Sequence, residues 1–362
     1  MKNLSIILLI LFFISCKEER VFTKSKVDHR AFTWTKPVSN DHSSQIAKSY
    51  EESLKIKPAN FSDIDSLISE KEVQDFIRKQ DTNYDKFELE SLPSFKANNQ
   101  PESIIKIIAK NQGINKSFYK YDIDGNGLTD IIAFAGGKST IALMNFGKQK
   151  IVKQIDMYHI EPVVVKIIPA RKSRLKVYTV PSTRWEYGKP VKPTSVELTF
   201  RENAFVEFND DPTNKKINKI EFAASMCFGT CPDFQLTLNK NNISYFIAKH
   251  YNFNQQVNKQ GDVEEGFFKG KINDKDFERI EDAFNYIDFE NLKSEYYISA
   301  TDMPSVTVVI TYDNGKVKKI YDYGLRGTYG LHEVYKMLFS LRFTQKWIET
   351  KEVLGVRMKD VF

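Results

Sequence analysis

Short runs of β-branched and aromatic residues recur from about residue 118 onward, and they constrain the fold more than any other feature. Up to about residue 208 the runs are bounded by Gly, Pro, Asn or Lys pairs, and they read IIAFAGG, IALMNF, VVVKII, LKVYTV and VELTF. Such runs are typical of strands that are at least half buried. Further strands are expected at 217–224, 234–239, 243–249, 305–312 and 317–323, with the turn residues Asp313-Asn314-Gly315 between the last two.

Helical patterns precede and interrupt these strands. Ser69 and Glu72 form a capping box before apolar residues at helical spacing. Another helix is expected from Pro101, and an earlier one over about 44–56. Two C-terminal helices are indicated by apolar faces made of Phe277, Ile280 and Phe284, and of Leu331, Val334, Leu338 and Leu341. The predicted class is α+β, with a helical N-terminal part, a β-rich middle module and a C-terminal α+β domain built on an antiparallel sheet.

The N-terminus has the parts of a secretory signal. Lys2 precedes an apolar stretch of 11 residues, Leu4–Ile14, and small Ser15 precedes Cys16. Eleven residues are too few to span a hydrocarbon layer, which needs about 20. The segment Phe13–Cys16 resembles a bacterial lipobox, which implies that Cys16 becomes the lipid-modified first residue of the mature chain. The alternative is an ordinary signal peptide followed by an accidental cysteine.

Lipidation at Cys16 would hold the protein on a membrane without spanning it. Lys17-Glu18-Glu19 resembles the signal of lipoproteins that reach the outer face of the outer membrane, although a charged tether is an equal alternative. The expected location is therefore the outer membrane, with its surface and periplasmic faces both left open. The expected organisation is a signal peptide at 1–15, a lipidated tether at 16–45, a helical region at 46–115, a β-rich region at 116–210, an α+β domain at 216–345 and a C-terminal tail at 346–362.

Charge and motifs exclude several function classes. The chain has 53 Lys+Arg against 47 Asp+Glu among 362 residues, and its basic residues are dispersed rather than gathered in a stripe. A nucleic-acid partner is therefore not expected. The five histidines form no H-E-x-x-H motif, and no G-x-S-x-G motif is present. Gly136–Thr140 imitates the end of a phosphate loop but lacks the required upstream glycine, so we reject it.

The most specific chemical signal is an acidic loop. Asp122, Asp124, Asn126 and Asp130 place oxygen-bearing side chains at positions 1, 3, 5 and 9, and Leu128 can offer its backbone carbonyl. Calcium takes six to eight oxygen ligands at about 2.3–2.6 Å, so a chain must curl around it. We predict a structural calcium site here. The alternative is a polar Asp-Gly/Asn-Gly turn that binds no ion.

This loop departs from the EF-hand pattern. Position 12 is Ala133 rather than a bidentate Glu, and the residues that follow the loop read as a strand. The segment 119–143 instead resembles a single calcium loop of the FG-GAP and VCBS-type repeats. No second copy is found, and one such unit cannot build a propeller.

Two cysteines remain after Cys16. Cys227 and Cys231 enclose Phe-Gly-Thr and precede Pro232, a spacing that suits a turn closed by a disulfide. A redox-active pair and a zinc site with His250 are the alternatives, but the spacing is not C-x-x-C and zinc needs four ligands. This C-F-G-x-C-P turn, with the later motif Thr301–Pro304, resembles the uncharacterised domain-of-unknown-function family 6438 over about 216–342. The resemblance implies no activity.

The sequence favours a lipid-anchored, calcium-stabilised envelope protein with a non-catalytic binding or structural role and an unidentified envelope or extracellular partner. Asp302 is a candidate binding or catalytic carboxylate in the C-terminal domain. The alternative is that it accepts local backbone hydrogen bonds, as the Asp of a Thr-Asp-x-Pro turn usually does. The alternative function is an envelope hydrolase whose site is assembled from dispersed residues such as Asp302, Tyr296 and His332.

Overall fold

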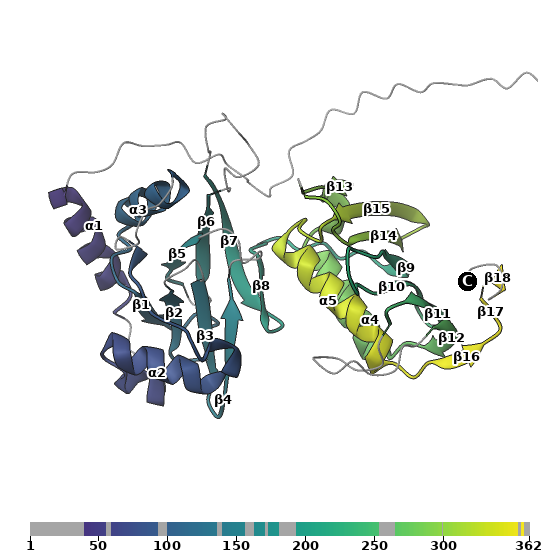
Figure 1. The fold of residues 1–362 in the computed structure, drawn as a ribbon, viewed down its shortest axis with the longest axis horizontal. Helices are drawn as coiled ribbons and strands as arrows, with labels where there is room; N and C mark the ends of the chain where they lie inside the picture. Colours follow the sequence, from purple (N-terminus) through teal and green to yellow (C-terminus); the bar gives the residue numbers. More distant parts are fainter. Residues whose placement is uncertain are drawn as a thin grey trace, which may run out of the picture.

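The computed structural model describes residues 40–55, 59–92, 100–135, 140–155, 163–170, 173–180, 193–252, 265–298, 300–353 and 356–357. These residues form two units that lie side by side (Figure 1). The first unit runs from α1 to β8 and the second from β9 to β16. Cys16 and residues 17–39 of the expected tether lie outside the described residues. Residues 40–45, which were also expected to belong to the tether, instead form the first turns of α1 (Asn40–Ser53), so the helical region begins earlier than predicted.

Helices and two antiparallel sheets make up the first unit. Its helical elements are α1 (Asn40–Ser53), η1 (Asp63–Ser66), α2 (Glu70–Gln80), η2 (Thr82–Tyr84) and α3 (Gln100–Gln112). One sheet has the order β1-β2-β3-β4, with β1 (Phe118–Tyr121), β2 (Asp130–Phe134), β3 (Thr140–Phe146) and β4 (Gln149–Gln154). The other has the order β5-β6-β7-β8, with β5 (Val163–Ile168), β6 (Arg174–Thr179), β7 (Thr194–Arg201) and β8 (Ala204–Glu207).

The first sheet is buried on both faces. Ile132 and Phe134 of β2 join a core cluster with α3 and the second sheet. Their neighbours Ile131 and Ala133 join a different cluster, together with Ile77 of α2. Successive side chains of a strand point to opposite faces, so a strand between two apolar layers is apolar at every position. This explains why β2 and β3 read as continuous apolar runs.

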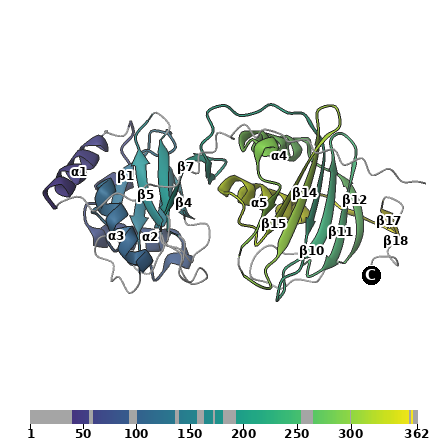
Figure 2. The ribbon, with the colours of Figure 1, turned by 90° about the horizontal axis from the view of Figure 1, so that it is seen from above.

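A single mixed sheet organises the second unit. Within the described residues its order is β13-β15-β14-β9-β10-β11-β12-β16, and all pairs are antiparallel except β13 with β15. The strands are β9 (Ile217–Ala224), β10 (Asp233–Asn239), β11 (Ile243–His250), β12 (Gly266–Lys271), β13 (Glu295–Tyr296), β14 (Ser305–Tyr312), β15 (Lys316–Tyr323) and β16 (Ile348–Thr350). Figure 2 shows α4 (Asp274–Tyr286) and α5 (Tyr329–Thr344) on one side of this sheet. The remaining elements are η5 (Phe289–Asn291), β17 (Glu352–Val353) and β18 (Val356–Arg357).

The α+β class is confirmed, and most expected elements are present. Strands β9 and β14 have the expected bounds, and Ser69 caps α2 through the expected capping box with Glu72. The C-terminal sheet is mixed rather than purely antiparallel, because β13 pairs in parallel with β15. The sheet also extends beyond residue 345, since Phe267 of β12 pairs with Thr350 of β16.

The two units share an interlocked boundary. Val206 of β8 belongs to the core cluster of the second unit, and Tyr329 of α5 packs against the core of the first. The Glu207 carboxylate accepts hydrogen bonds from the backbone N–H groups of Tyr329 (2.7 Å) and Gly330 (2.8 Å). These are free donors in the first turn of α5, where a negative charge is also favoured by the helix dipole.

Further contacts hold this boundary. Arg201 of β7 forms an ion pair with Asp282 of α4, and Arg279 of α4 lies 3.0 Å from Glu202. Gly330 leaves no room for a side chain, because a Cβ there would lie 2.3 Å from Cγ2 of Ile287. The segment after β8 is likewise held against α4, since Asn209 donates its side-chain N–H to the Tyr286 carbonyl at 2.7 Å.

The Glu207 carboxyl gives the boundary a pH dependence. Desolvation raises its pKa above the ordinary value of 4.5, against the lowering effect of its backbone donors. The folded state therefore binds this proton more tightly than the unfolded state, and the resulting stabilisation is lost as pH rises from about 4.5 through the folded pKa. We expect the free energy of unfolding of wild type to fall relative to that of Glu207→Gln as pH increases, in urea titrations between pH 4.5 and 7.5.

Glu88→Gln serves as the matched control, because Glu88 is exposed. Its difference from wild type should show no comparable trend over the same range. A difference between wild type and Glu207→Gln that stays constant with pH would contradict the assigned direction of the pKa shift.

Candidate functional site

The acidic loop joins β1 to β2 and is organised around Asp122. The Asp122 carboxylate accepts hydrogen bonds from the backbone N–H groups of Gly125 (2.8 Å), Asn126 (3.1 Å) and Gly127 (2.9 Å). The curl requires left-handed backbone at the two glycines, where φ is 78° at Gly125 and 83° at Gly127. Glycine adopts this conformation without steric cost, which explains the Asp-Gly-Asn-Gly sequence.

The next two polar residues tighten the same curl. Asp124 accepts a hydrogen bond from the Asn126 backbone N–H at 3.0 Å. The Asn126 side chain accepts from the Leu128 N–H at 2.8 Å and donates to the Asn145 carbonyl at 2.8 Å. Asn126 therefore connects the loop to β3, so its amide supports the loop from within.

Asp130 closes the loop from a buried position. It is fully buried, and it accepts hydrogen bonds from the backbone N–H groups of Ile123 and Asn145, each at 2.7 Å. Desolvation raises the pKa of this carboxyl to about 8, and the charges of Asp124 and Asp122 act in the same direction. The two backbone donors act in the opposite direction. A cation beside Asp130 would stabilise its ionised form.

Three of the predicted ligands converge. Carboxylate oxygens of Asp122, Asp124 and Asp130 all lie within 4.8 Å of one another. Oxygens that bind one calcium ion at about 2.3–2.6 Å can be at most about 5 Å apart, so this spacing fits a shared ion. The side chains of Asn126 and Asp124 are in direct contact, at 3.2 Å between Asn126 Nδ2 and Asp124 Oδ2. Leu128 lies in the same loop, with its N–H held by Asn126.

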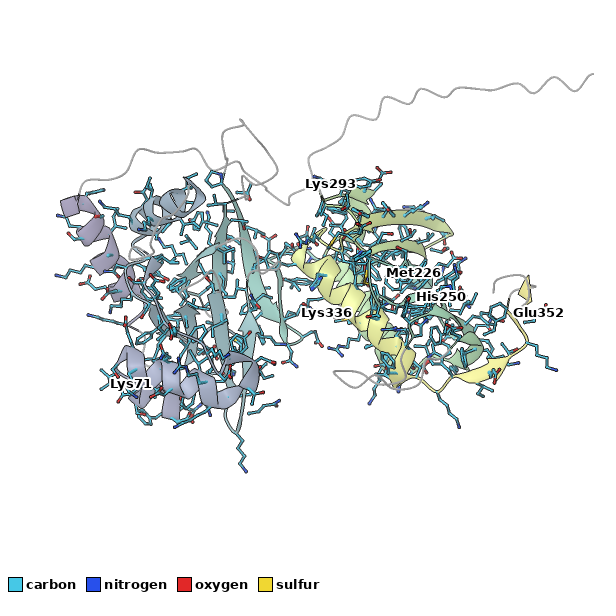
Figure 3. All side chains as sticks on the ribbon, viewed as in Figure 1. Lys71, Met226, His250, Lys293, Lys336 and Glu352 are labelled. Carbon is cyan, nitrogen blue, oxygen red and sulfur yellow. A yellow bond between two sulfur atoms is a disulfide. The ribbon has the colours of Figure 1, made fainter. Side chains whose placement is uncertain are left out.

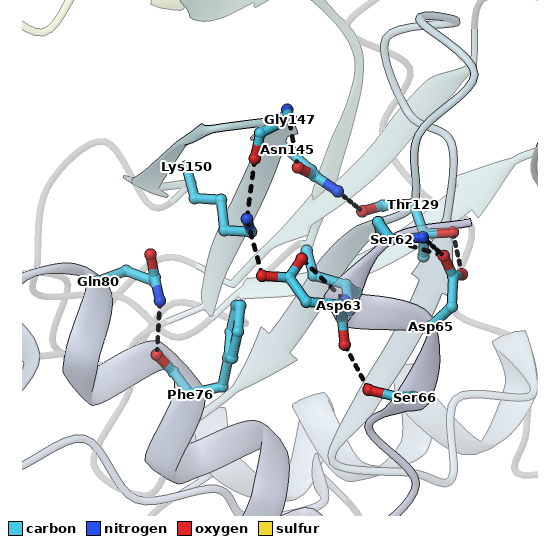
Figure 4. A network of polar contacts seen from close by, with 11 residues as sticks. Ser62, Asp63, Asp65, Ser66, Phe76, Gln80, Thr129, Asn145, Gly147 and Lys150 are labelled. Atoms are coloured by element: carbon cyan, nitrogen blue, oxygen red, sulfur yellow. Dashed lines mark hydrogen bonds and ion pairs between the residues drawn. The ribbon is translucent and has the colours of Figure 1, made fainter. Parts of the chain in front are cut away.

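Residues far away in the sequence brace the loop. The Gly127 carbonyl accepts a hydrogen bond from the Asn60 N–H at 3.1 Å, and the Thr129 hydroxyl donates to Asp65 at 2.5 Å. Figure 4 shows the adjoining network, in which Asn145 contacts Thr129 and the Lys150 ammonium lies 2.9 Å from Asp63. The loop is thereby connected to η1 and, through it, to the helical part of the first unit. Sequence reasoning missed these bracing residues, because no local pattern relates them to the loop.

The cysteine pair closes the turn between β9 and β10. Cys227 and Cys231 are joined by a disulfide with a Cα–Cα distance of 5.5 Å. The expected disulfide distance is thus confirmed. His250, the zinc ligand of the alternative hypothesis, is instead 3.6 Å from Glu265. The turn also exposes apolar side chains, with Phe228 at 90% exposure.

The two motifs of the C-terminal unit meet in space. The Phe228 N–H donates to the Asp302 carbonyl at 3.0 Å, so the cysteine turn rests on the Thr-Asp-x-Pro segment. Asp302 has a left-handed φ of 61°, a conformation in which Asp is enriched among non-glycine residues. The backbone of Asp302 thus forms the contact between the two motifs, and the side chain is exposed.

The residues of the predicted hydrolase site have separate partners. Tyr296 accepts a hydrogen bond from the Lys293 N–H at 3.2 Å, and burial raises its pKa to about 12. His332 has its Nδ1 atom 3.3 Å from the Leu325 carbonyl, and burial lowers the pKa of the ring. Among the described residues, no hydrogen bond or ion pair joins Asp302, Tyr296 and His332 to one another.

Breaking the disulfide should lower stability by a limited amount. On the loop-entropy model, so small a loop contributes about 2 kcal/mol to the free energy of unfolding. We expect the double variant Cys227→Ser, Cys231→Ser to lose about that amount in urea titrations. Wild type in dithiothreitol, where the disulfide is reduced, should then have the same free energy of unfolding as the double variant. Equal stability of oxidised wild type and the variant would show that the disulfide adds nothing.

Comparison with family models gives a match in the second unit. Residues 218–342 match the family model described as "Domain of unknown function (DUF6438)". Comparison with curated proteins and with solved structures gave no match. The matched range covers β9 to most of α5, and it includes both the cysteine turn and the Asp302 segment. The second unit is therefore similar to this family over the matched range.

Proposed function

We propose that this chain is a lipid-anchored cell-envelope protein whose first unit is stabilised by calcium and whose role is binding or structural rather than catalytic. The observation that carries the calcium proposal is the convergence of the Asp122, Asp124 and Asp130 carboxylates within 4.8 Å. Negative charge on all three carboxylates at once would be opposed by their mutual repulsion, and the raised pKa of Asp130 reflects burial together with that repulsion. The attraction of a divalent cation for the three carboxylates would outweigh that repulsion.

The ligand chemistry favours calcium. Carboxylate oxygens and a backbone carbonyl are hard ligands, which suit calcium and magnesium better than zinc or copper. Magnesium demands near-ideal octahedral geometry at shorter distances, whereas calcium accepts irregular shells. A glycine-containing loop in which Asp122 already accepts three backbone hydrogen bonds offers an irregular shell.

A structural role follows from where the loop is attached. Its residues contact η1 through Asp65 and β3 through Asn145. A cation here would therefore hold the β1–β2 loop, η1 and β3 together. With a dissociation constant of about 0.1 mM, millimolar calcium would add about 1.4 kcal/mol to stability. That affinity suits the envelope and the extracellular space, where calcium reaches millimolar concentrations.

The proposed anchor depends on the sequence before residue 40. Leu4–Ile14 and the lipobox-like segment ending at Cys16 support export followed by lipidation. Among the described residues, the structure contains no helix long and apolar enough to cross a membrane. The proposed site of attachment is the outer membrane, and the proposed partner is an unidentified envelope or extracellular molecule.

Calcium should raise the thermal stability of the protein. At millimolar calcium we expect a melting temperature about 3–5 °C above that in chelator, because about 1.4 kcal/mol is added to a domain of this size. Asp124→Asn should abolish that rise, since it removes one ligand charge while leaving an oxygen for the Asn126 N–H. Differential scanning calorimetry measures both.

Asp85→Asn is the matched control, because Asp85 is exposed and lies outside the loop. It should keep the full calcium response. Identical melting curves with calcium and with chelator for wild type would overturn the calcium proposal.

Lipid attachment should depend on a single sulfur atom. Cells grown with an alkyne-labelled palmitate should label wild type, and Cys16→Ser should lose the label and leave the membrane fraction. The cysteine-turn variant Cys227→Ser, Cys231→Ser keeps Cys16 and should be labelled like wild type. Labelling that persists in Cys16→Ser would refute the anchor at this position.

A further inference from the structure

A pocket of about 190 Å³ lies at the boundary of the two units. It is lined by β4, by the β7–β8 turn with the start of β8, and by the first two turns of α5. The polar and charged side chains of the lining are those of Lys153, Gln154, Asn203, Tyr329, His332, Glu333 and Lys336. Figure 3 shows Lys336 on α5 where that helix borders the first unit. The volume holds several water molecules or a small organic molecule.

One face of α5 is directed at this pocket. Tyr329, His332, Glu333 and Lys336 follow the spacing i, i+3, i+4 and i+7, which places them on one side of a helix. The apolar residues of the same helix form the core of the second unit instead. The helix therefore has a core face and a separate polar face that lines the pocket.

The pocket carries an excess of positive charge. Glu333 is paired with Lys336 at 2.6 Å, so its charge is largely offset within α5. Lys153 comes from the opposite wall, and its ammonium group makes no hydrogen bond or ion pair with any residue in the described ranges. Burial and the nearby Lys336 both lower its pKa, while Glu333 raises it. Two lysines against one glutamate leave a net charge of +1.

The remaining lining suits an anion with an organic body. The His332 ring has Nδ1 at 3.3 Å from the Leu325 carbonyl, an acceptor, so the proton sits on Nδ1 and Nε2 is left as an acceptor for a hydroxyl group of the ligand's organic part. Buried Ile155 and Phe205 supply apolar walls beside these polar groups. Apolar walls with a few convergent polar groups are the usual composition of small-molecule sites.

We propose that this pocket binds a small organic oxyanion, a molecule that bears a carboxylate or a phosphate. The oxyanion takes the position between Lys153 and Lys336, where its charge offsets the excess positive charge that remains after Lys336 pairs with Glu333. Its apolar or hydroxylated part lies against Phe205 and the His332 ring. Because Lys153 belongs to the first unit and Lys336 to the second, the bound anion also links the two units.

Isothermal titration calorimetry on the full-length protein tests the proposal. Succinate and inorganic phosphate are the probes, each added in calcium-free buffer at constant ionic strength, so that calcium chelation does not contribute. We expect saturable binding of at least one probe. Binding of succinate alone assigns a carboxylate ligand, and binding of phosphate alone assigns a phosphate ligand.

Substitutions then place the bound anion in the pocket. Lys153→Gln should weaken binding at least tenfold, whereas Lys153→Arg, which keeps the charge, should retain most of it. Lys319→Gln is the control, since Lys319 is an exposed lysine of β15 outside the pocket lining. Unchanged melting temperatures show that each variant is folded. Absence of binding for both probes up to 20 mM, or equal binding by wild type and Lys153→Gln, would overturn the proposal.

Discussion

The contact between Glu207 and the first turn of α5 determines how the two units are arranged. The Glu207 carboxylate occupies the backbone donors of Tyr329 and Gly330, while the adjacent Val206 is buried in the core of the second unit. A strand of one unit thus caps a helix of the other. This contact also positions the pocket. One wall of the pocket is β4 with the β7–β8 turn, and the other wall is the beginning of α5, the same part of the helix that Glu207 caps.

Much of the fold could be predicted because strong patterns mark buried strands. β9 and β14 are runs of eight residues rich in β-branched and aromatic side chains, with a buried apolar residue at nearly every second position, so their bounds are explicit in the sequence. β4 reads QKIVKQ, β8 has four residues, and β12 contains two glycines and two lysines, so none of them stands out locally. These strands exist because neighbouring strands supply their hydrogen bonds. Such tertiary context is absent from a local pattern.

The candidate sites divide in the same way. The spacing of Asp122, Asp124 and Asp130 predicted their convergence, since all three belong to one loop. The contacts of Asp65 and Asn145 with the loop could not be predicted, because only the folded chain brings these residues to the loop. The polar face of α5 did leave a signal, in the helical spacing of Tyr329, His332, Glu333 and Lys336. Its meaning depended on knowing that β4 lies opposite.

Strand β4 connects the acidic loop of the first unit with the pocket at the boundary of the two units. Lys150 and Lys153 are three residues apart, so their side chains point to opposite faces of the sheet. Lys150 pairs with Asp63 in the network beside the acidic loop, and Lys153 lines the pocket. A cation that orders the loop would therefore also hold one end of the strand that forms a pocket wall. The acidic site and the pocket are opposite in charge, and the same strand carries a lysine to each.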